Sequence, residues 1–118
     1  MPRIAVVLLA GTGTPTDMGR MANALETAAE AAEAGDELRL ILDGAGTTWI
    51  PALADAEHKY HDLYQEIKPH ITGACEYCAN AYGVKQAVLR EEVPLLDEHR
   101  GHPSLRTLVA EGFAVLTF

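Results

Sequence analysis

The sequence is poor in positive charge, in cysteine and in aromatic residues. Its 118 residues carry 9 Lys and Arg against 17 Asp and Glu, a formal net charge of −8, and the basic residues are scattered. Nucleic acids and anionic membranes are bound by clusters of Lys and Arg, so this composition argues against both kinds of partner. With only two cysteines, the chain lacks the disulfide framework that stabilises many small secreted domains.

Long hydrophobic runs are absent as well. The longest, Ile4–Ala10, is far shorter than the roughly 20 residues that span a bilayer, and it lacks the features of a signal peptide. We therefore expect a soluble, cytoplasmic protein. The apolar content of 48% is enough for one hydrophobic core, and no linker or repeat divides the chain, which predicts a single domain over residues 1–118.

The apolar pattern predicts five short strands that alternate with helices. Strands are expected at Arg3–Ala10, Leu38–Leu42, Ile71–Cys75, Val93–Leu96 and Phe113–Phe118. Helices are expected at Asp17–Ala34, Pro51–Ile67 with a break near Asp55, Cys78–Arg90 with a break at Gly83, and Pro103–Glu111. This alternation predicts an α/β fold with a parallel sheet and helices on both faces. Pro94 indicates that its strand lies at a sheet edge.

Helical spacing also indicates where the first helix begins and which side chains enter the core. Thr16 or Asp17 is the expected N-cap of the first helix. The side chains expected to face inward are Met18, Met21, Leu25, Ala28 and Ala32, then Leu53, Ala56, Tyr60, Leu63, Tyr64 and Ile67, and finally Leu105, Leu108 and Val109.

Ligands of open parallel sheets bind at the carboxyl ends of the strands. The stretches expected there are Gly11–Thr16, Asp43–Trp49, Cys75–Cys78 and Asp97–His102. The cysteine pair therefore lies in a region suited to chemistry.

Cys75 and Cys78 are the candidate catalytic residues. Cys75 ends a strand and Cys78 begins a helix, so the first-turn amides are expected to lower the pKa of the Cys75 thiol, while neighbouring Glu76 opposes this effect. The spacing lets Cys78 resolve an oxidised or persulfidated Cys75. The alternative is that at least one of the two is simply a buried small hydrophobic residue, and Cys78 is the better candidate for this structural role.

The segment Ile71-Thr-Gly-Ala-Cys75-Glu-Tyr-Cys78-Ala-Asn-Ala-Tyr-Gly83-Val84 resembles the DsrE/DsrF-like family, which includes sulfur-relay subunits of the TusD type. The shared features are a cysteine at the end of the third strand, a short helix, and a glycine followed by an aliphatic residue. The resemblance extends in layout over the whole chain. It implies a three-layer α/β/α sandwich with a parallel five-stranded sheet.

The resemblance also implies a function. Family members carry sulfur as a cysteine persulfide, pass it between donor and acceptor proteins, and assemble as homotrimers or homohexamers. By position, Cys75 would carry the persulfide in a sulfurtransferase-like carrier. Many family members have no second cysteine at the position of Cys78, and its presence here would allow thiol–disulfide chemistry. No cofactor and no resident metal are implied, and a non-catalytic oligomeric subunit is the alternative if Cys75 is inert.

Two other site hypotheses come from the residues alone. Gly11–Thr16 could hold a flavin phosphate, with Trp49 and Tyr77 as ring-stacking aromatics, although an ordinary strand-to-helix connection is the favoured interpretation. Threonines of these loops, Thr12, Thr14, Thr47 and Thr48, could instead support a sulfur anion.

A zinc site is the second of these hypotheses. His58 and His61 with Cys75 and Cys78 have the right ligand types, but the helical spacing of the histidines favours a solvated face. Within Asp97–His102, an imidazole could serve Cys75 as a general base, whereas the composition is more typical of a mobile polar loop.

Overall fold

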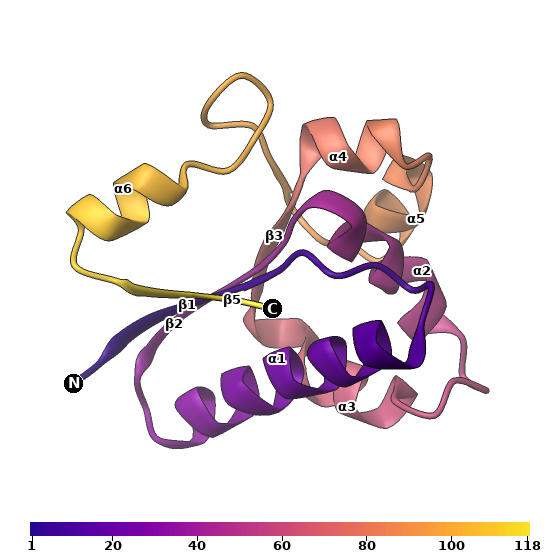
Figure 1. Cartoon of the computed structure of the whole chain (residues 1–118), viewed down its shortest axis with the longest axis horizontal. Helices are drawn as coiled ribbons and strands as arrows, with labels where there is room; N and C mark the ends of the chain where they lie inside the picture. The colour runs from indigo at the N-terminus through magenta and orange to yellow at the C-terminus, as the bar shows by residue number, and fades with distance from the viewer.

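Five parallel strands form the centre of the structure, a computed structural model that describes all residues 1–118 (Figure 1). They are β1 (Arg3–Leu8), β2 (Glu37–Leu42), β3 (Ile71–Cys75), β4 (Leu95–Leu96) and β5 (Ala114–Thr117). Their order in the sheet is β4-β3-β2-β1-β5, and every neighbouring pair is parallel. The predicted sheet is confirmed, including the edge position of the strand that follows Pro94.

Helices cover the two faces of this sheet unequally. The larger core packs one face against α1 (Pro15–Glu33), α2 (Trp49–Ala54), α3 (His61–Ile67), α4 (Glu76–Ala81) and α5 (Lys85–Arg90). Only α6 (Leu105–Ala110) covers the other face, over a small cluster that includes Ala5, Val7 and Ile41. Figure 1 shows α6 across the sheet from α1 and α3. The fold is thus a three-layer α/β/α sandwich with one thin layer, as predicted.

The ends of several helices differ from the predicted ends. The first helix begins at Pro15 because Thr14, rather than Thr16 or Asp17, is the N-cap and its Oγ1 accepts a hydrogen bond of 3.1 Å from the Asp17 amide. The predicted break near Asp55 is confirmed by the loop between α2 and α3. Gly83, with φ of +72°, separates α4 from α5 as predicted.

Two of the side chains predicted to face inward are exposed. Ala56 lies in the loop after α2, where the helical spacing used to predict its burial no longer holds. Val109 is 62% exposed because α6 is short and buries mainly Leu108 against the sheet. The other predicted core positions are buried or half-buried.

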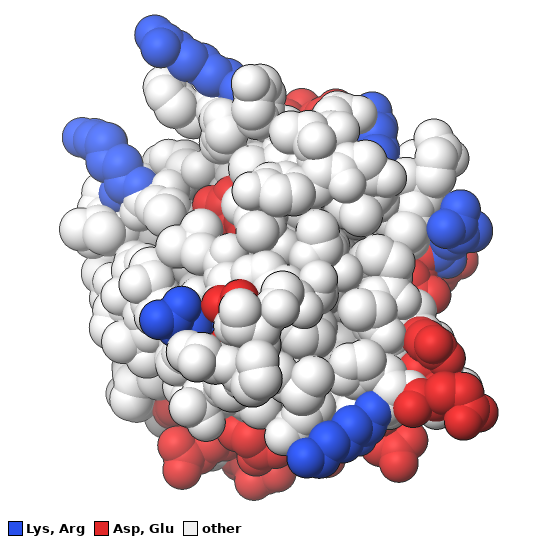
Figure 2. Space-filling view, turned by 45° about the vertical axis from the view of Figure 1, so that its right-hand side comes forward, with Lys and Arg blue, Asp and Glu red and all other residues white.

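On the face that Figure 2 shows, most acidic side chains gather along the bottom and lower right, whereas the basic ones stand singly. A shallow groove beside α1 and α3 is lined by Glu26, Glu30, Glu33 and Glu66. None of the helices combines the length and apolar character that crossing a membrane requires.

A register shift between β2 and β3 sets the geometry of the site. Leu40 pairs with Ile71, but the next pairs are Ile41 with Gly73 and Leu42 with Ala74, so Thr72 is passed over. The Thr72 hydroxyl takes the place of a ladder acceptor and receives a hydrogen bond of 3.0 Å from the Leu40 amide. As a result, Asp43 follows β2 directly beside Cys75 at the end of β3.

Glu91 ties the end of α5 to α3. Its Oε1 accepts hydrogen bonds from the Tyr64 hydroxyl at 2.6 Å and from the Lys68 ammonium at 3.2 Å. The Tyr64 hydrogen bond, helped by the Lys68 charge, holds the pKa of Glu91 below its usual range. Because the folded pKa is lowered, this stabilisation is present above the unfolded pKa and is lost as pH falls through the folded one.

We expect Glu91→Gln to lower the free energy of unfolding by about 1 kcal/mol near neutral pH, because a charge-assisted acceptor becomes a neutral one. Urea unfolding followed by circular dichroism measures this difference. It should begin to shrink as the pH falls through the ordinary Glu pKa of about 4.3, and reach zero only below the lowered pKa of the folded protein, where the wild-type carboxyl is also neutral. Glu66→Gln, at an exposed position of α3, is the control and should change little; a difference that does not depend on pH would contradict the assignment.

Candidate functional site

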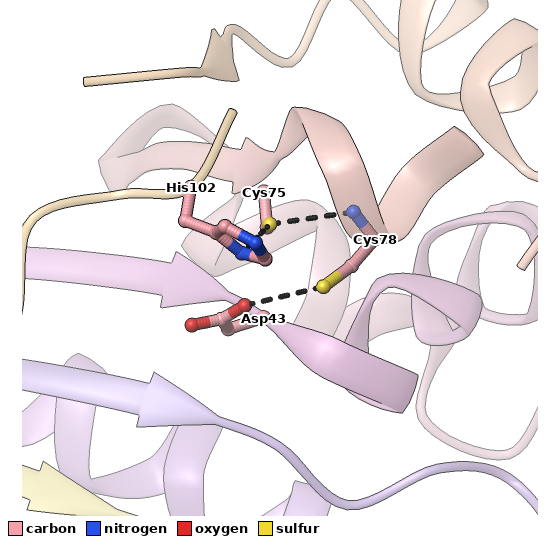
Figure 3. A group of neighbouring side chains, drawn as sticks. All are labelled: Asp43, Cys75, Cys78 and His102. Atoms are coloured by element: carbon pink, nitrogen blue, oxygen red, sulfur yellow. Dashed lines mark hydrogen bonds between the residues drawn. The ribbon is translucent and has the colours of Figure 1, made fainter. Parts of the chain in front are cut away.

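Four chemically active side chains meet at the carboxyl edge of the sheet (Figure 3). Asp43 follows β2, Cys75 is the last residue of β3, Cys78 lies in the first turn of α4, and His102 lies in the connection between β4 and α6. One ligand atom of each lies within 4.8 Å of the others. The parallel sheet brings these residues together because adjacent parallel strands end at the same edge.

Cys75 is the N-cap of α4 and the centre of this cluster. Its Sγ accepts a hydrogen bond of 3.3 Å from the Cys78 amide, lies 3.3 Å from His102 Nδ1, and lies 3.7 Å from the carbonyl oxygen of Gly101. The side chain is completely buried. The thiol is therefore enclosed by polar groups rather than by aliphatic side chains alone.

Asp43 and Cys78 form the second contact of the cluster. The Cys78 thiol donates a weak hydrogen bond of 3.6 Å to Asp43 Oδ1, which also accepts one of 2.8 Å from the Gly44 amide. The Gly44 bond caps the short 3-10 helix Gly44–Thr48 and fixes the carboxylate. Cys78 is half-buried and more accessible than Cys75.

A tight turn covers Cys75. His99 and His102 exchange two backbone hydrogen bonds of 2.8 Å, and the central residues Arg100 and Gly101 both have positive φ, as type I′ turns require. The Gly101 carbonyl accepts a hydrogen bond of 2.9 Å from the Tyr77 amide. The turn thus satisfies an amide of the first turn of α4, which no helical carbonyl can reach.

The Tyr77 ring packs against the outer side of His102. The two ring centroids are 4.8 Å apart, and the Tyr77 side chain itself is 59% exposed. Tyr77 therefore holds the imidazole in place against Cys75 through its ring, while its backbone amide holds the turn.

Burial keeps the Cys75 thiol protonated in the resting protein. Loss of solvation raises the pKa of Cys75 to about 12, the Cys78 amide acts in the opposite direction, and the nearby Asp43 charge raises it further. The expectation of a lowered pKa is therefore wrong for this state. The predicted amide does point at the sulfur, but one hydrogen bond does not offset the removal of the thiol from water.

A family model described as "DsrE/DsrF-like family" matches residues 5–118, nearly the whole chain. The chain belongs to the DsrE/DsrF-like family. This family is associated with sulfur relay, in which its members work with partner proteins. Cys75, the residue that the resemblance assigns to the persulfide, lies at the centre of the cluster in this DsrE/DsrF-like domain.

Two further comparisons give a sequence relative and a solved structure of the same fold, and neither of their names states an activity. The domain is 28% identical over 100 residues to the uncharacterized protein MJ0733 of Methanocaldococcus jannaschii, covering 85% of this chain and 81% of that protein. A solved structure of a conserved protein of unknown function, BT1422 of Bacteroides thetaiotaomicron, superimposes with a TM-score of 0.60 at 18% identity. It covers 97% of this chain and 94% of its own, and this likeness supports the fold.

The histidines considered for zinc are not near the cysteines. His58 Nδ1 accepts a hydrogen bond from the Tyr60 amide, and its ring meets the edge of Trp49. His61 Nδ1 lies 2.7 Å from the Leu53 carbonyl oxygen. Both therefore stabilise the loop between α2 and α3. The histidine of the cluster is instead His102, from the polar segment after β4. The sequence analysis favours a mobile loop for this segment, and that interpretation is wrong for His102, which contacts Cys75.

The flavin hypothesis loses one of its two aromatic partners in this DsrE/DsrF-like domain. Trp49 is buried, and its Nε1 donates a hydrogen bond of 2.9 Å to the Ala10 carbonyl, so it is not available to stack on a ring. The Thr47 and Thr48 hydroxyls donate to the Gly44 and Ala45 carbonyls. Thr14 caps α1. These hydroxyls are thus engaged locally instead of supporting a sulfur anion.

We expect Gly101→Ala to expose Cys75. A Cβ at Gly101 would lie 3.3 Å from Tyr77 Cβ, and the φ of +85° disfavours any side chain there. Displacement of the turn would hydrate the sulfur, return its pKa towards the ordinary value near 9, and increase its thiolate fraction at mildly alkaline pH. Alkylation of Cys75 by iodoacetamide, measured in a Cys78→Ala background across a pH series, should become faster and shift to lower pH.

Gly35→Ala is the matched control for this experiment. Gly35 has a similar φ of +76° but lies after α1, away from the cluster. It should cost similar backbone strain without changing the alkylation of Cys75. Equal rates in the two variants would show that the turn does not limit access to the thiol.

Proposed function

We propose that this DsrE/DsrF-like domain is a persulfide sulfur carrier, with Cys75 as the sulfur-bearing residue and Cys78 as a resolving thiol. The observation that carries the proposal is the contact of 3.3 Å between His102 Nδ1 and the Sγ of Cys75, the residue that the family resemblance assigns to the persulfide. A protonated thiol needs a base to become a nucleophile, and this imidazole is at the distance of a proton acceptor.

The transfer step follows from these contacts. When a donor persulfide reaches the sulfur with His102 still in contact, His102 Nδ1 accepts the Cys75 proton, and the thiolate attacks the outer sulfur of the donor persulfide. A bond forms between Cys75 Sγ and that sulfur, the donor S–S bond breaks, and the donor leaves as a thiolate that takes the proton back. Cys75 thereby becomes a persulfide and the donor becomes a thiol. The Cys78 amide can continue to donate its hydrogen bond to Cys75 Sγ after the transfer.

Two routes release the sulfur. An acceptor thiolate can attack the outer sulfur, which forms a persulfide on the acceptor and returns Cys75 as a thiolate. Alternatively, the Cys78 thiolate attacks Cys75 Sγ, which forms a disulfide between the two residues and expels hydrosulfide. A dithiol reductant must then restore both thiols. The short separation of the two sulfurs within the cluster supports this second route.

Intact mass spectrometry after exposure to a small persulfide donor tests the carrier role. We expect Cys78→Ala to gain about 32 Da, the mass of one sulfur, and Cys75→Ala to gain nothing. The wild type should show either this gain or the Cys75–Cys78 disulfide with released hydrosulfide. His102→Gln should slow the gain by about 100-fold if the imidazole is the base. Failure of the folded Cys78→Ala variant to gain sulfur would contradict the proposal and favour a non-catalytic subunit.

We also infer, from the family resemblance, that the chain assembles as a homotrimer or homohexamer. Leu116 on the edge strand β5 is 39% exposed and Val109 on α6 is 62% exposed, and unpaired edges with apolar side chains are disposed to pair.

Native mass spectrometry of the wild type should give the mass of three or six chains. Leu116→Lys should shift the protein to smaller species, whereas the control Leu89→Lys, at an exposed position of α5, should keep the wild-type mass. A monomer at all concentrations would contradict this inference.

A further inference from the structure

The cluster contains more ligands than sulfur transfer requires. The two thiols and the imidazole each have a role in the proposed transfer, whereas the Asp43 carboxylate has none and still converges with them from a separate segment. Figure 3 shows the side chains of Asp43, Cys75, Cys78 and His102 directed towards a common centre. Two thiols, an imidazole and a carboxylate are the ligand types that bind Zn²⁺ in proteins.

The distances are close to those of a tetrahedral site. Bonds of about 2.3 Å to sulfur and about 2.0–2.2 Å to nitrogen or oxygen place the ligand atoms of a zinc site about 3.3–3.8 Å apart. Cys75 Sγ and His102 Nδ1 are 3.3 Å apart, and Cys78 Sγ and Asp43 Oδ1 are 3.6 Å apart. All other separations are at most 4.8 Å, so small side-chain rotations would close the set around one ion.

The surroundings supply the hydrogen bonds that usually orient zinc ligands. The Gly44 amide holds the Asp43 carboxylate at 2.8 Å, and the Cys78 amide donates to Cys75 Sγ at 3.3 Å. The Tyr77 ring packs on His102 and fixes the plane of the imidazole. Such supporting contacts set ligand orientation and affinity in known metal sites.

We propose that Asp43, Cys75, Cys78 and His102 bind one divalent zinc ion in tetrahedral geometry. Binding displaces one proton from each thiol to solvent and leaves two thiolates and a carboxylate around the ion. Hard cations such as Mg²⁺ and Ca²⁺ prefer oxygen ligands and are disfavoured by this set. Because zinc would occupy the Cys75 thiolate, the metal-bound protein cannot accept sulfur at that atom.

Cobalt substitution tests the site directly. The reduced, metal-free full chain is titrated with Co²⁺, which reports its geometry and sulfur ligation by absorption, and Zn²⁺ is then added to displace it. We expect one Co²⁺ per chain, the d–d bands of a tetrahedral ion with a sulfur-to-cobalt charge-transfer band, and complete displacement by one equivalent of Zn²⁺. A spectrum of octahedral Co²⁺ without sulfur charge transfer would overturn the proposal.

Variants identify the ligands. Competition against a chromophoric chelator should show zinc affinity reduced by about 10-fold or more in Asp43→Asn, Cys78→Ser and His102→Gln. His70→Gln, at an exposed histidine, is the matched control and should bind as the wild type does. Circular dichroism of each metal-free variant checks that it is folded, and unchanged affinity in folded Asp43→Asn and His102→Gln would overturn the four-ligand assignment.

This inference does not rest on the carrier role, and the two can fail separately. Zinc binding is measured on protein that was never exposed to a sulfur donor, and the mass gain in the presence of a donor is measured without metal. Zinc binding without a mass gain would support the metal site and contradict the carrier. A mass gain without stoichiometric zinc binding would support the carrier role and contradict the metal site.

Discussion

The pairing register between β2 and β3 is the constraint on which the candidate site depends. Because Thr72 is passed over and its hydroxyl substitutes for a ladder acceptor, the strand ends bring Asp43 beside Cys75. A regular ladder would shift the partner by one residue and place Gly44 beside Cys75 instead. Gly73 makes the arrangement possible on the other side, since a Cβ there would lie 2.7 Å from the Pro94 carbonyl oxygen and would push β4 away. Side-chain chemistry at this edge is therefore decided by backbone geometry within the sheet.

Burial of Cys75 makes its thiol unreactive in the resting protein, so a reactive state requires a change at this residue. The thiol has the local features of an activated cysteine, with an amide and an imidazole in contact, yet removal from water outweighs them and keeps it protonated. The turn that encloses it is held by the Tyr77 amide and ring, which belong to the helix that Cys75 itself caps. Access and ionisation are thus coupled, because movement of one short turn changes both. Such coupling would protect a reactive sulfur until a donor, an acceptor or a metal ion reaches it.

Much of the architecture follows from local patterns, and the errors have physical causes. Aliphatic runs and glycine or proline breaks define the strands because they reflect backbone propensity and burial, and the break at Gly83 follows from its left-handed conformation. The prediction that Ala56 and Val109 face inward extends a helical period into a loop in the first case and along a helix of only 6 residues in the second. Cys75 and Cys78 were identified from spacing and family resemblance. Asp43 appears in the sequence analysis only as the start of a stretch at the carboxyl edge. The same analysis allows an imidazole from Asp97–His102 to serve Cys75 as a base, but the residues alone do not choose between His99 and His102.

By itself, the sequence determined the order of elements, the parallel sheet and the placement of the cysteine pair at its carboxyl edge, since each depends on neighbouring residues along the chain. Only the tertiary structure decided which residues meet that pair. The contacts of Asp43 and His102 with the cysteines join residues 35 and 27 positions apart, and they arise from strand register and from a turn docked on a helix. The ionisation of Cys75 was decided there too, because burial is a property of the packed chain as a whole and not of the residues beside the cysteine.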